Sequence, residues 1–365
     1  MAVEQLQTFL EAFSNSHHTT RTVVVCPNGE TFQFGQSDNR EPLMLYIKNL
    51  EMIQMCTRNY IEGLESSYLH GYWDCNNIPG LLSLPFNQQS RRRRSPTYLK
   101  KYLHNPLSAK NIKNFPQDAQ RIESLNLEFN AAWLDPSLSA TIAHFKSGKK
   151  DPLYIAQQRR LQTLLKILQQ RHALSILETN ACWGAFTEKA CLHHDLTLTT
   201  LSQQHAEFCK NRLQNIPFPI NYQIKTDKLN PHAYNQFDAI VSMLPQLSTK
   251  SECQQFFKYI NTHLKKHGIA CLQLVTDATI PHHTIGKLML KMGFRILEHQ
   301  TINRDAAKTY RYWLNNFSAN FSQLEKMGFS KPFLRQWKYH LSAIAHYFST
   351  EHLQARDYVI EKISE

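Results

Sequence analysis

The amino-terminal part of the chain combines strand-like and helix-like patterns of apolar positions. Residues 21–35, RTVVVCPNGETFQFG, hold two short apolar runs joined by Asn-Gly, a dipeptide that favours the tight turn of a β-hairpin. Residues 42–56 have apolar positions at helical spacing, and residues 66–84 are typical of a helix followed by a turn. These segments predict a small α+β domain over residues 1–88.

From about residue 150, helix-like and strand-like segments alternate along the chain. The helix-like segments are 155–171, 185–194, 203–214, 253–268 and 285–293, and the strand-like segments are 175–179, 196–201, 220–227, 237–244, 269–276 and 294–300. We expect Gly268 to close the fourth of these helices. Strict alternation predicts a mostly parallel sheet with helices on both faces, whose ligands bind at the carboxyl ends of the strands. The fold class expected for residues 126–365 is therefore Rossmann-like α/β.

The net charge of +12 is concentrated in one basic segment between these two parts. Residues 88–104, QQSRRRRSPTYLKKYLH, contain no acid. Their cationic side chains are those of Arg91, Arg92, Arg93, Arg94, Lys100 and Lys101. A solvated linker over residues 89–125 is the first interpretation. Contact with an acidic membrane surface is the second, and nucleic-acid binding is the third because no recognised reading element accompanies the run.

Two further features limit the classes of protein to consider. No apolar run approaches the roughly 18–20 residues that cross a bilayer, and the first residues, MAVEQLQTFLEAF, lack the regions of a signal peptide. The default compartment is therefore the cytoplasm. The eight cysteines and eighteen histidines show no convincing ligand spacing, which favours free or buried thiols over disulfides or a metal site.

One segment stands where a ligand site is expected. Residues 176–190, ILETNACWGAFTEKA, predict a strand, a tight turn and a helix at the first strand end of the alternating region. A turn that approaches a nucleotide closely is normally rich in glycine, whereas Gly184 is the only glycine of this segment. The segment is either a changed cofactor loop or a strand and helix that hold no cofactor.

Several segments resemble the cyclopropane-fatty-acyl-phospholipid synthase family. Residues 63–75, GLESSYLHGYWDC, resemble the family's amino-terminal signature, and residues 155–186 are similar to the helix and strand that precede its cofactor turn. Residues 307–317 and 327–348 look like the carboxy-terminal helices that cover its acyl pocket. The resemblance implies a class I methyltransferase fold that binds S-adenosylmethionine and acts on acyl chains of membrane phospholipids.

The same resemblance assigns a cofactor role to residues of the turn. The family's turn runs acid-x-Gly-x-Gly-Trp-Gly, and this chain has Glu178, Asn180, Cys182, Trp183 and Gly184 at the matching positions. Asparagine tolerates the left-handed backbone conformation, so position 180 can keep its turn. Cysteine lacks that tolerance, and its side chain is expected to project toward the cofactor and to weaken its binding.

Further cofactor contacts are implied after the next two strands. Thr200, Leu201 and Ser202 match the family's Thr-Leu-Ser, which lies on the ribose and adenine side, while His205 replaces a glutamine. Asp227 roughly fits an acid that faces the adenine in the family.

The catalytic positions differ more. The family grips a bicarbonate base partly with a Glu-His pair after the fourth strand, and here Leu247 and Ser248 stand at that pair. Ile142 stands at the cysteine of the family's Tyr-Ser-Cys-x-Tyr-Phe element. Leucine can neither bind bicarbonate nor orient a base.

Two hypotheses follow from this resemblance. In the first, the chain is a methyltransferase of acyl chains with reduced or altered activity, peripheral at the inner face of the membrane. In the second, it is a catalytically inactive relative that binds lipid or regulates an intact paralogue. The expected partners are membrane phospholipids and a second subunit, which is either another copy of this chain or that paralogue.

Overall fold

The computed structural model describes residues 6–7, 9–11, 21–35, 41–84, 115–124, 126–148, 150–200, 202–216, 220–225, 236–245, 247, 249–277 and 280–363. These residues form two compact units. The first unit holds the described residues up to 84 with 115–121 and 317–346, and the second holds 122–316 and 347–363. The expected boundaries near residues 88 and 125 fall outside the described residues and stay predictions, as does the role of the basic run.

The first unit is built on a four-stranded sheet of order β2-β1-β3-β4. The strands are β1 (Thr22–Val25), β2 (Thr31–Phe34), β3 (Leu43–Ile47) and β4 (Trp73–Cys75). The predicted hairpin is confirmed, because β1 and β2 pair antiparallel and Gly29 in their turn has a φ of 86°.

Two local predictions in this unit are wrong. Residues 42–56 do not form one helix, because Leu43, Leu45 and Ile47 are buried at a spacing of two and build β3. Helix α2 (Glu51–Arg58) begins only after it, and α3 (Tyr60–Leu69) and α4 (Ile78–Ser83) follow. The sequence pattern also misses β4, a three-residue strand that pairs antiparallel with β3.

One arginine explains why the signature segment folds as it does. Arg335 lies on α17 (Lys331–Ser349), which follows α16 (Phe321–Lys326). Its guanidinium donates to the carbonyls of Tyr68 at 2.6 Å and Trp73 at 2.7 Å, and to Asp74 Oδ1 at 2.7 Å. It also lies 3.8 Å above the centre of the Tyr68 ring. The aromatic and acidic residues of this signature therefore bind a distant helix of the same unit.

The second unit is an α/β sandwich around a seven-stranded sheet of order β10-β11-β9-β8-β5-β6-β7. The strands are β5 (Ser175–Thr179), β6 (Asp195–Thr199), β7 (Tyr222–Lys225), β8 (Phe237–Met243), β9 (Leu264–Asp277), β10 (Phe294–Thr301) and β11 (Leu353–Lys362). The helices are α9 (Asn126–Ala131), α10 (Leu153–Gln170), α11 (Ala185–Ala190), α12 (Gln203–Gln214), α13 (Lys250–His263) and α14 (His282–Lys291). Helices α8 (Pro116–Ser124) and α15 (Asn303–Ala319) have residues in both units.

The expected Rossmann-like α/β class is confirmed, with one strand that the sequence pattern does not predict. β5, β6, β7, β8 and β9 pair in parallel. β11 enters antiparallel between β9 and β10. Its charged and apolar residues do not alternate regularly, and its burial follows no simple period.

The predicted closure of a helix by Gly268 is also wrong. Helix α13 ends at His263, and β9 begins at the next residue. Gly268 lies within β9, where a Cβ atom would come within 2.9 Å of the carbonyl oxygen of Asp238 on β8. This glycine is required for the close approach of two strands rather than for a helix end.

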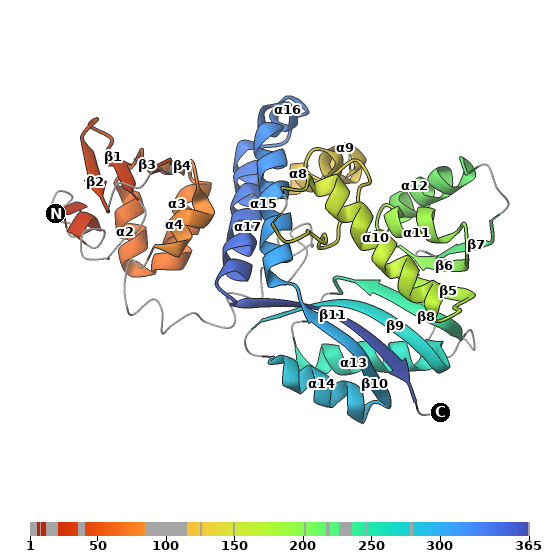
Figure 1. Ribbon diagram of the computed structural model, residues 1–365. Helices are drawn as coiled ribbons and strands as arrows, with labels where there is room; N and C mark the ends of the chain where they lie inside the picture. The colour runs from red at the N-terminus through yellow and green to blue at the C-terminus, as the bar shows by residue number, and fades with distance from the viewer. Residues whose placement is uncertain are drawn as a thin grey trace. The chain divides into compact units, whose positions relative to one another are not determined.

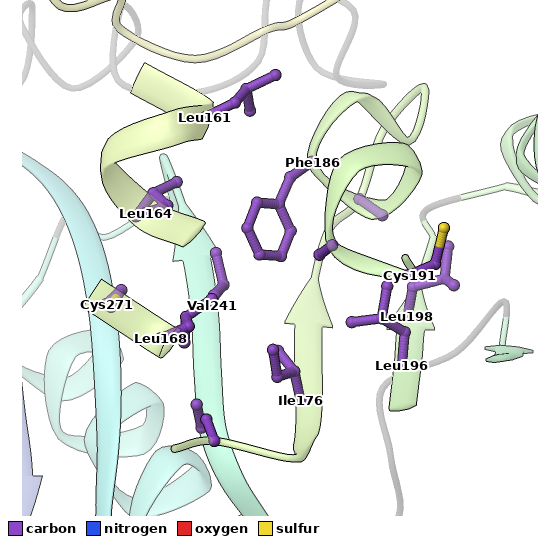
Figure 2. Close-up of a cluster of buried hydrophobic side chains, with 14 of the residues drawn as sticks. Leu161, Leu164, Leu168, Ile176, Phe186, Cys191, Leu196, Leu198, Val241 and Cys271 are labelled. Carbon is purple, nitrogen blue, oxygen red and sulfur yellow. The ribbon is translucent and has the colours of Figure 1, made fainter. Parts of the chain in front are cut away.

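Helices cover both faces of the large sheet (Figure 1), with α10, α11 and α12 on one face and α13 and α14 on the other. In the core of the first face, Phe186 of α11 lies between α10 and β5, near Leu164 (Figure 2). Within the described ranges, no helix combines the length and apolar character needed to cross a membrane.

The order of the strands places the candidate site. β5 pairs with β6 on one side and with β8 on the other, so the chain connections diverge between β5 and β8. Ligands of open α/β sheets bind in the crevice that this divergence opens at the carboxyl ends of the strands. The turn after Thr179 and the segment after Met243 lie at these ends.

We predict that Arg335→Gln lowers the free energy of unfolding by about 3 kcal/mol, because it removes a buried guanidinium that bonds two carbonyls and a carboxylate. Arg335→Lys should recover only part of this loss, since the single nitrogen of an ammonium replaces three separate nitrogens of the guanidinium. Chemical denaturation measures both. Arg295→Gln is the control, because the Arg295–Glu361 pair has an arginine side chain that is 61% exposed and should contribute less than about 1 kcal/mol. Equal effects at the two arginines would contradict the prediction.

Candidate cofactor and active site

The turn between β5 and α11 has a left-handed backbone at every second residue. The φ angles are 55° at Asn180, 48° at Cys182 and 72° at Gly184. Asn180 thus keeps the turn as the sequence indicates, and Cys182 adopts the same conformation although cysteine does not favour it. For a residue with a Cβ atom this conformation is unfavourable by about 1–2 kcal/mol. The glycine-type backbone is therefore present where two of the three glycines of the family's turn are replaced.

Hydrogen bonds from neighbouring strands and helices hold this turn. The N–H of Ala181 donates to the carbonyl of Thr199 at 2.9 Å, and the N–H of Gly184 donates to the carbonyl of Ala181 at 2.8 Å. The Cys209 thiol of α12 donates to the carbonyl of Cys182 at 3.5 Å. A Cβ atom at Gly184 would lie 3.0 Å from that thiol sulfur, so glycine at this position is needed for space as well as for its φ.

Arg212 of α12 is a contact of the turn that the sequence analysis missed. Its Nη1 donates to the carbonyls of Trp183 at 2.9 Å and Ser137 at 3.0 Å, and its Nη2 pairs with Glu188 of α11 at 2.6 Å. No local pattern separates Arg212 from the other charged residues of α12. Its role depends on partners 24 to 75 positions away in sequence.

Glu178 is a buried carboxyl group at the end of β5. It is 6% exposed, and it accepts a hydrogen bond from the Thr187 hydroxyl of α11. Burial raises its pKa to about 8, against the opposing effects of Thr187 and Arg212. At neutral pH the carboxyl is therefore mostly protonated, and it ties the strand before the turn to the helix after it.

A small cavity adjoins the turn. Its volume is about 40 Å³, which is room for roughly three water molecules. The lining residues are Leu138, Ser139, Ala140, Thr141, Leu161, Leu164, Glu178, Thr179, Asn180, Ala181, Cys182, Ala185, Phe186 and Met243. The structure thus brings Glu178, Asn180 and Cys182 together around one cavity, with the segment 138–141 as another part of its wall.

The residues after β6 lie beside the turn. Thr200 is buried, and the Ser202 hydroxyl accepts from the N–H of His205 to cap α12. The His205 ring packs edge to face on Trp183, with 4.5 Å between ring centres, and burial lowers its pKa. Leu201 and Asp227 lie outside the described residues, so their predicted contacts stay predictions.

Two of the three residues that the resemblance places at the family's base, Leu247 and Ile142, have buried apolar side chains. Leu247 is 5% exposed and belongs to the same buried cluster as Cys253 and Phe257. Ile142 is fully buried, and its N–H and carbonyl both bond the side-chain amide of Gln273, at 2.8 and 3.2 Å. Neither side chain can accept or donate a proton. Ser248 lies outside the described residues.

The cysteines and histidines form neither a disulfide nor a metal site among the described residues. All eight cysteines are free thiols, and all except Cys182 are buried. No group of three metal-ligating side chains comes together among the described residues.

Strand order, antiparallel insertion of β11 and the turn after β5 together define a class I S-adenosylmethionine methyltransferase-like fold. The sequence profile described as mycolic acid cyclopropane synthetase matches residues 116–284 and 279–358. The chain therefore belongs to the cyclopropane synthase family of S-adenosylmethionine methyltransferases.

Individual relatives agree with this assignment. The cyclopropane-fatty-acyl-phospholipid synthase of Escherichia coli (strain K12) is 22% identical over 343 residues, 86% of this chain and 86% of its own. The tuberculostearic acid methyltransferase UfaA1 of Mycobacterium tuberculosis is 20% identical over 84% of this chain and 80% of its own. The structure of mycolic acid cyclopropane synthase CmaA1, complexed with SAH and CTAB, has a TM-score of 0.58 at 17% identity and covers 66% of this chain and 95% of that one.

We predict that Glu178 makes stability depend on pH between about 4.5 and 8. Its pKa is about 8 in the folded protein against an ordinary value of 4.5. In this window the unfolded chain releases a proton that the folded protein keeps, so the free energy of unfolding falls as pH rises. The Glu178→Gln variant should lack this fall and gain stability relative to the unchanged protein as pH rises from 5 to 8. Denaturation midpoints at several pH values test this, and parallel profiles would contradict it.

Proposed function

We propose that this chain transfers a methyl group from S-adenosylmethionine to unsaturated acyl chains of membrane phospholipids, with an altered outcome that lacks ring closure. The observation that carries the proposal is the left-handed backbone at Asn180, Cys182 and Gly184. A turn that keeps an unfavourable conformation after losing two glycines is held there by its surroundings. Such retention supports continued use of the turn for a cofactor.

The relatives support the same class of reaction. One is named a cyclopropane-fatty-acyl-phospholipid synthase and another a tuberculostearic acid methyltransferase. The solved structure of CmaA1 contains SAH, the product that a methyl donor leaves. Both acyl-chain methylation and cyclopropanation therefore occur in the names of proteins similar to this chain.

The residues around the turn fit the cofactor in part. S-adenosylmethionine, when bound, supplies an electrophilic methyl group on its sulfonium sulfur. The backbone of residues 180–184 would hold it from the β5 side, and Thr200 and Ser202 from the β6 side. The poor fit is at Cys182, whose half-buried side chain lines a cavity of about 40 Å³. This side chain would therefore take up space on the cofactor side of the turn.

The apolar residues at the base positions support the altered outcome. In methyl transfer, the double bond of the acyl chain would donate its electron pair to the methyl carbon, and the neighbouring chain carbon would carry a positive charge until a proton leaves. Ring closure requires a base that takes this proton from the transferred methyl group. Leu247 and Ile142 provide no such base. Breakage of the carbon–sulfur bond would leave the donor as the neutral thioether SAH. Without that base, a proton on the chain carbon next to the cation would pass to water, and its electron pair would form a new double bond beside the methyl branch.

The Cys182 side chain in the wall of the cavity favours a second candidate function. In that function the chain binds no cofactor and is a lipid-binding or regulatory partner of an intact paralogue. In both candidate functions, the basic run at residues 91–94 would contact phospholipid peripherally, from the cytoplasmic side of the membrane. That contact lies outside the described residues and rests on charge alone.

We predict that the purified protein binds S-adenosylmethionine in titration calorimetry, and that a Cys182→Gly/Asn180→Gly variant binds it about tenfold more tightly. Removal of the Cys182 side chain widens the cavity, and a tenfold change corresponds to about 1.4 kcal/mol. Cys253→Ala is the control, because this buried thiol lies in the core on the other face of the sheet. No binding at millimolar cofactor would contradict the proposal and support the second candidate.

A further inference from the structure

We propose that Arg212 is a positioning residue that holds the cofactor turn in its left-handed conformation and thereby offsets the loss of two glycines. The cofactor part of this inference rests on the proposed function, whereas the conformational part does not. Arg212 touches no reacting atom in this account. It acts through the backbone of the turn.

The guanidinium of Arg212 lies among three hydrogen-bond acceptors. Three groups surround it: the carbonyl of Trp183 within the turn, the carbonyl of Ser137, and the carboxylate of Glu188 on the helix that follows the turn. Its side chain is 15% exposed, so these bonds are largely shielded from water. The guanidinium reaches these partners with two separate nitrogens, Nη1 and Nη2, which the single nitrogen of an ammonium cannot replace.

The bonds of Arg212 oppose a change in the backbone conformation of Cys182. Cys182 is the residue directly before Trp183, and its φ of 48° is unfavourable for a side chain with a Cβ atom. Rotation of Cys182 toward an ordinary φ would move the peptide carbonyl of Trp183 away from Arg212. The bond from Arg212 to Trp183 therefore resists the relaxation that cysteine favours.

Arg212 also connects two parts of the cavity wall. Ser137 directly precedes Leu138 and Ser139, which line the cavity together with Cys182. By bonding Ser137 and Trp183 with the same Nη1 atom, Arg212 fixes the spacing between two parts of that wall. Loss of Arg212 should disturb both parts together.

The coupling between Arg212 and Cys182 distinguishes this role from ordinary support of the fold. If Arg212 compensates for the missing glycines, its removal should matter in the natural sequence and matter much less once those glycines are restored. A residue that only stabilises the fold would show the same loss in both backgrounds.

The experiment is a double-mutant cycle of Arg212→Gln with Cys182→Gly/Asn180→Gly in the full chain, read by hydrogen exchange without cofactor. We expect the N–H groups of Ala181 and Gly184 to exchange at least tenfold faster in Arg212→Gln, and less than threefold faster when the same change is made in the glycine background. Arg212→Lys, which keeps the charge and can still pair with Glu188, should behave like Arg212→Gln. Equal acceleration in both backgrounds, or full protection in Arg212→Lys, would overturn the inference.

Arg159→Gln is the matched control. Arg159 lies on α10, its side chain is 20% exposed, and it bonds one carboxylate, that of Asp151 at 2.9 Å, and one carbonyl, that of His144 at 2.7 Å. It contacts no residue of the turn through these bonds, so it should show no coupling with Cys182. Coupling as large as that of Arg212 would overturn the inference.

The dissociation constant for S-adenosylmethionine is measured on the same set of variants. Arg212→Gln should weaken binding at least tenfold in the natural background and less than threefold in the glycine background. If the unchanged protein binds no cofactor, the proposed function fails, and the exchange measurement still decides the role of Arg212. If it binds and Arg212→Gln leaves both exchange and affinity unchanged, the inference on Arg212 fails alone.

Discussion

Between β5 and α11 the chain must turn within a few residues while it packs against α12. The close approach of Gly184 to the Cys209 thiol, where a Cβ atom would lie 3.0 Å from the sulfur, sets the path of this turn. The path in turn requires positive φ angles at Asn180 and Cys182. The other features of the site adjoin this turn: Glu178 is buried before it, α11 begins after it, and the cavity lies against it.

The strand order is that of a class I methyltransferase-like fold, and the turn after β5 has the backbone of a glycine-rich turn. Leu247 and Ile142, which the resemblance places at the family's base, are buried side chains that cannot take up a proton. Because backbone geometry depends on packing over the whole unit while proton transfer depends on single side chains, the second can change without the first.

The sequence predicts those parts of the fold that have a regular local pattern. The hairpin at Asn28-Gly29 and the alternation of strands and helices from β5 to β10 are of this kind. β4 and β11 are missed because one is very short and the other has irregular burial. The start of β9 is misplaced because Gly268 resembles a helix end, whereas its real constraint comes from Asp238 on a neighbouring strand.

In the site, family resemblance identifies the turn but not the residues that hold it. Arg212 and Gln273 bond backbone groups as far as 75 and 131 positions away, and no pattern within their own helix or strand marks them. The conformation of Cys182 is likewise decided by tertiary contacts against the preference of the residue. Such long-range compensation is visible only once the fold is known.

The most direct test of the account follows the methyl group into lipid. The protein is expressed in a host that lacks its own cyclopropane synthase and grows on methionine with a fully deuterated methyl group, and its phospholipid acyl chains are analysed by mass spectrometry. If the protein transfers a methyl group without closing a ring, the product is a methyl-branched unsaturated chain that keeps all the deuterium of the transferred group. A cyclopropane chain that has lost one deuterium per methyl group would contradict the account, and so would acyl chains without label.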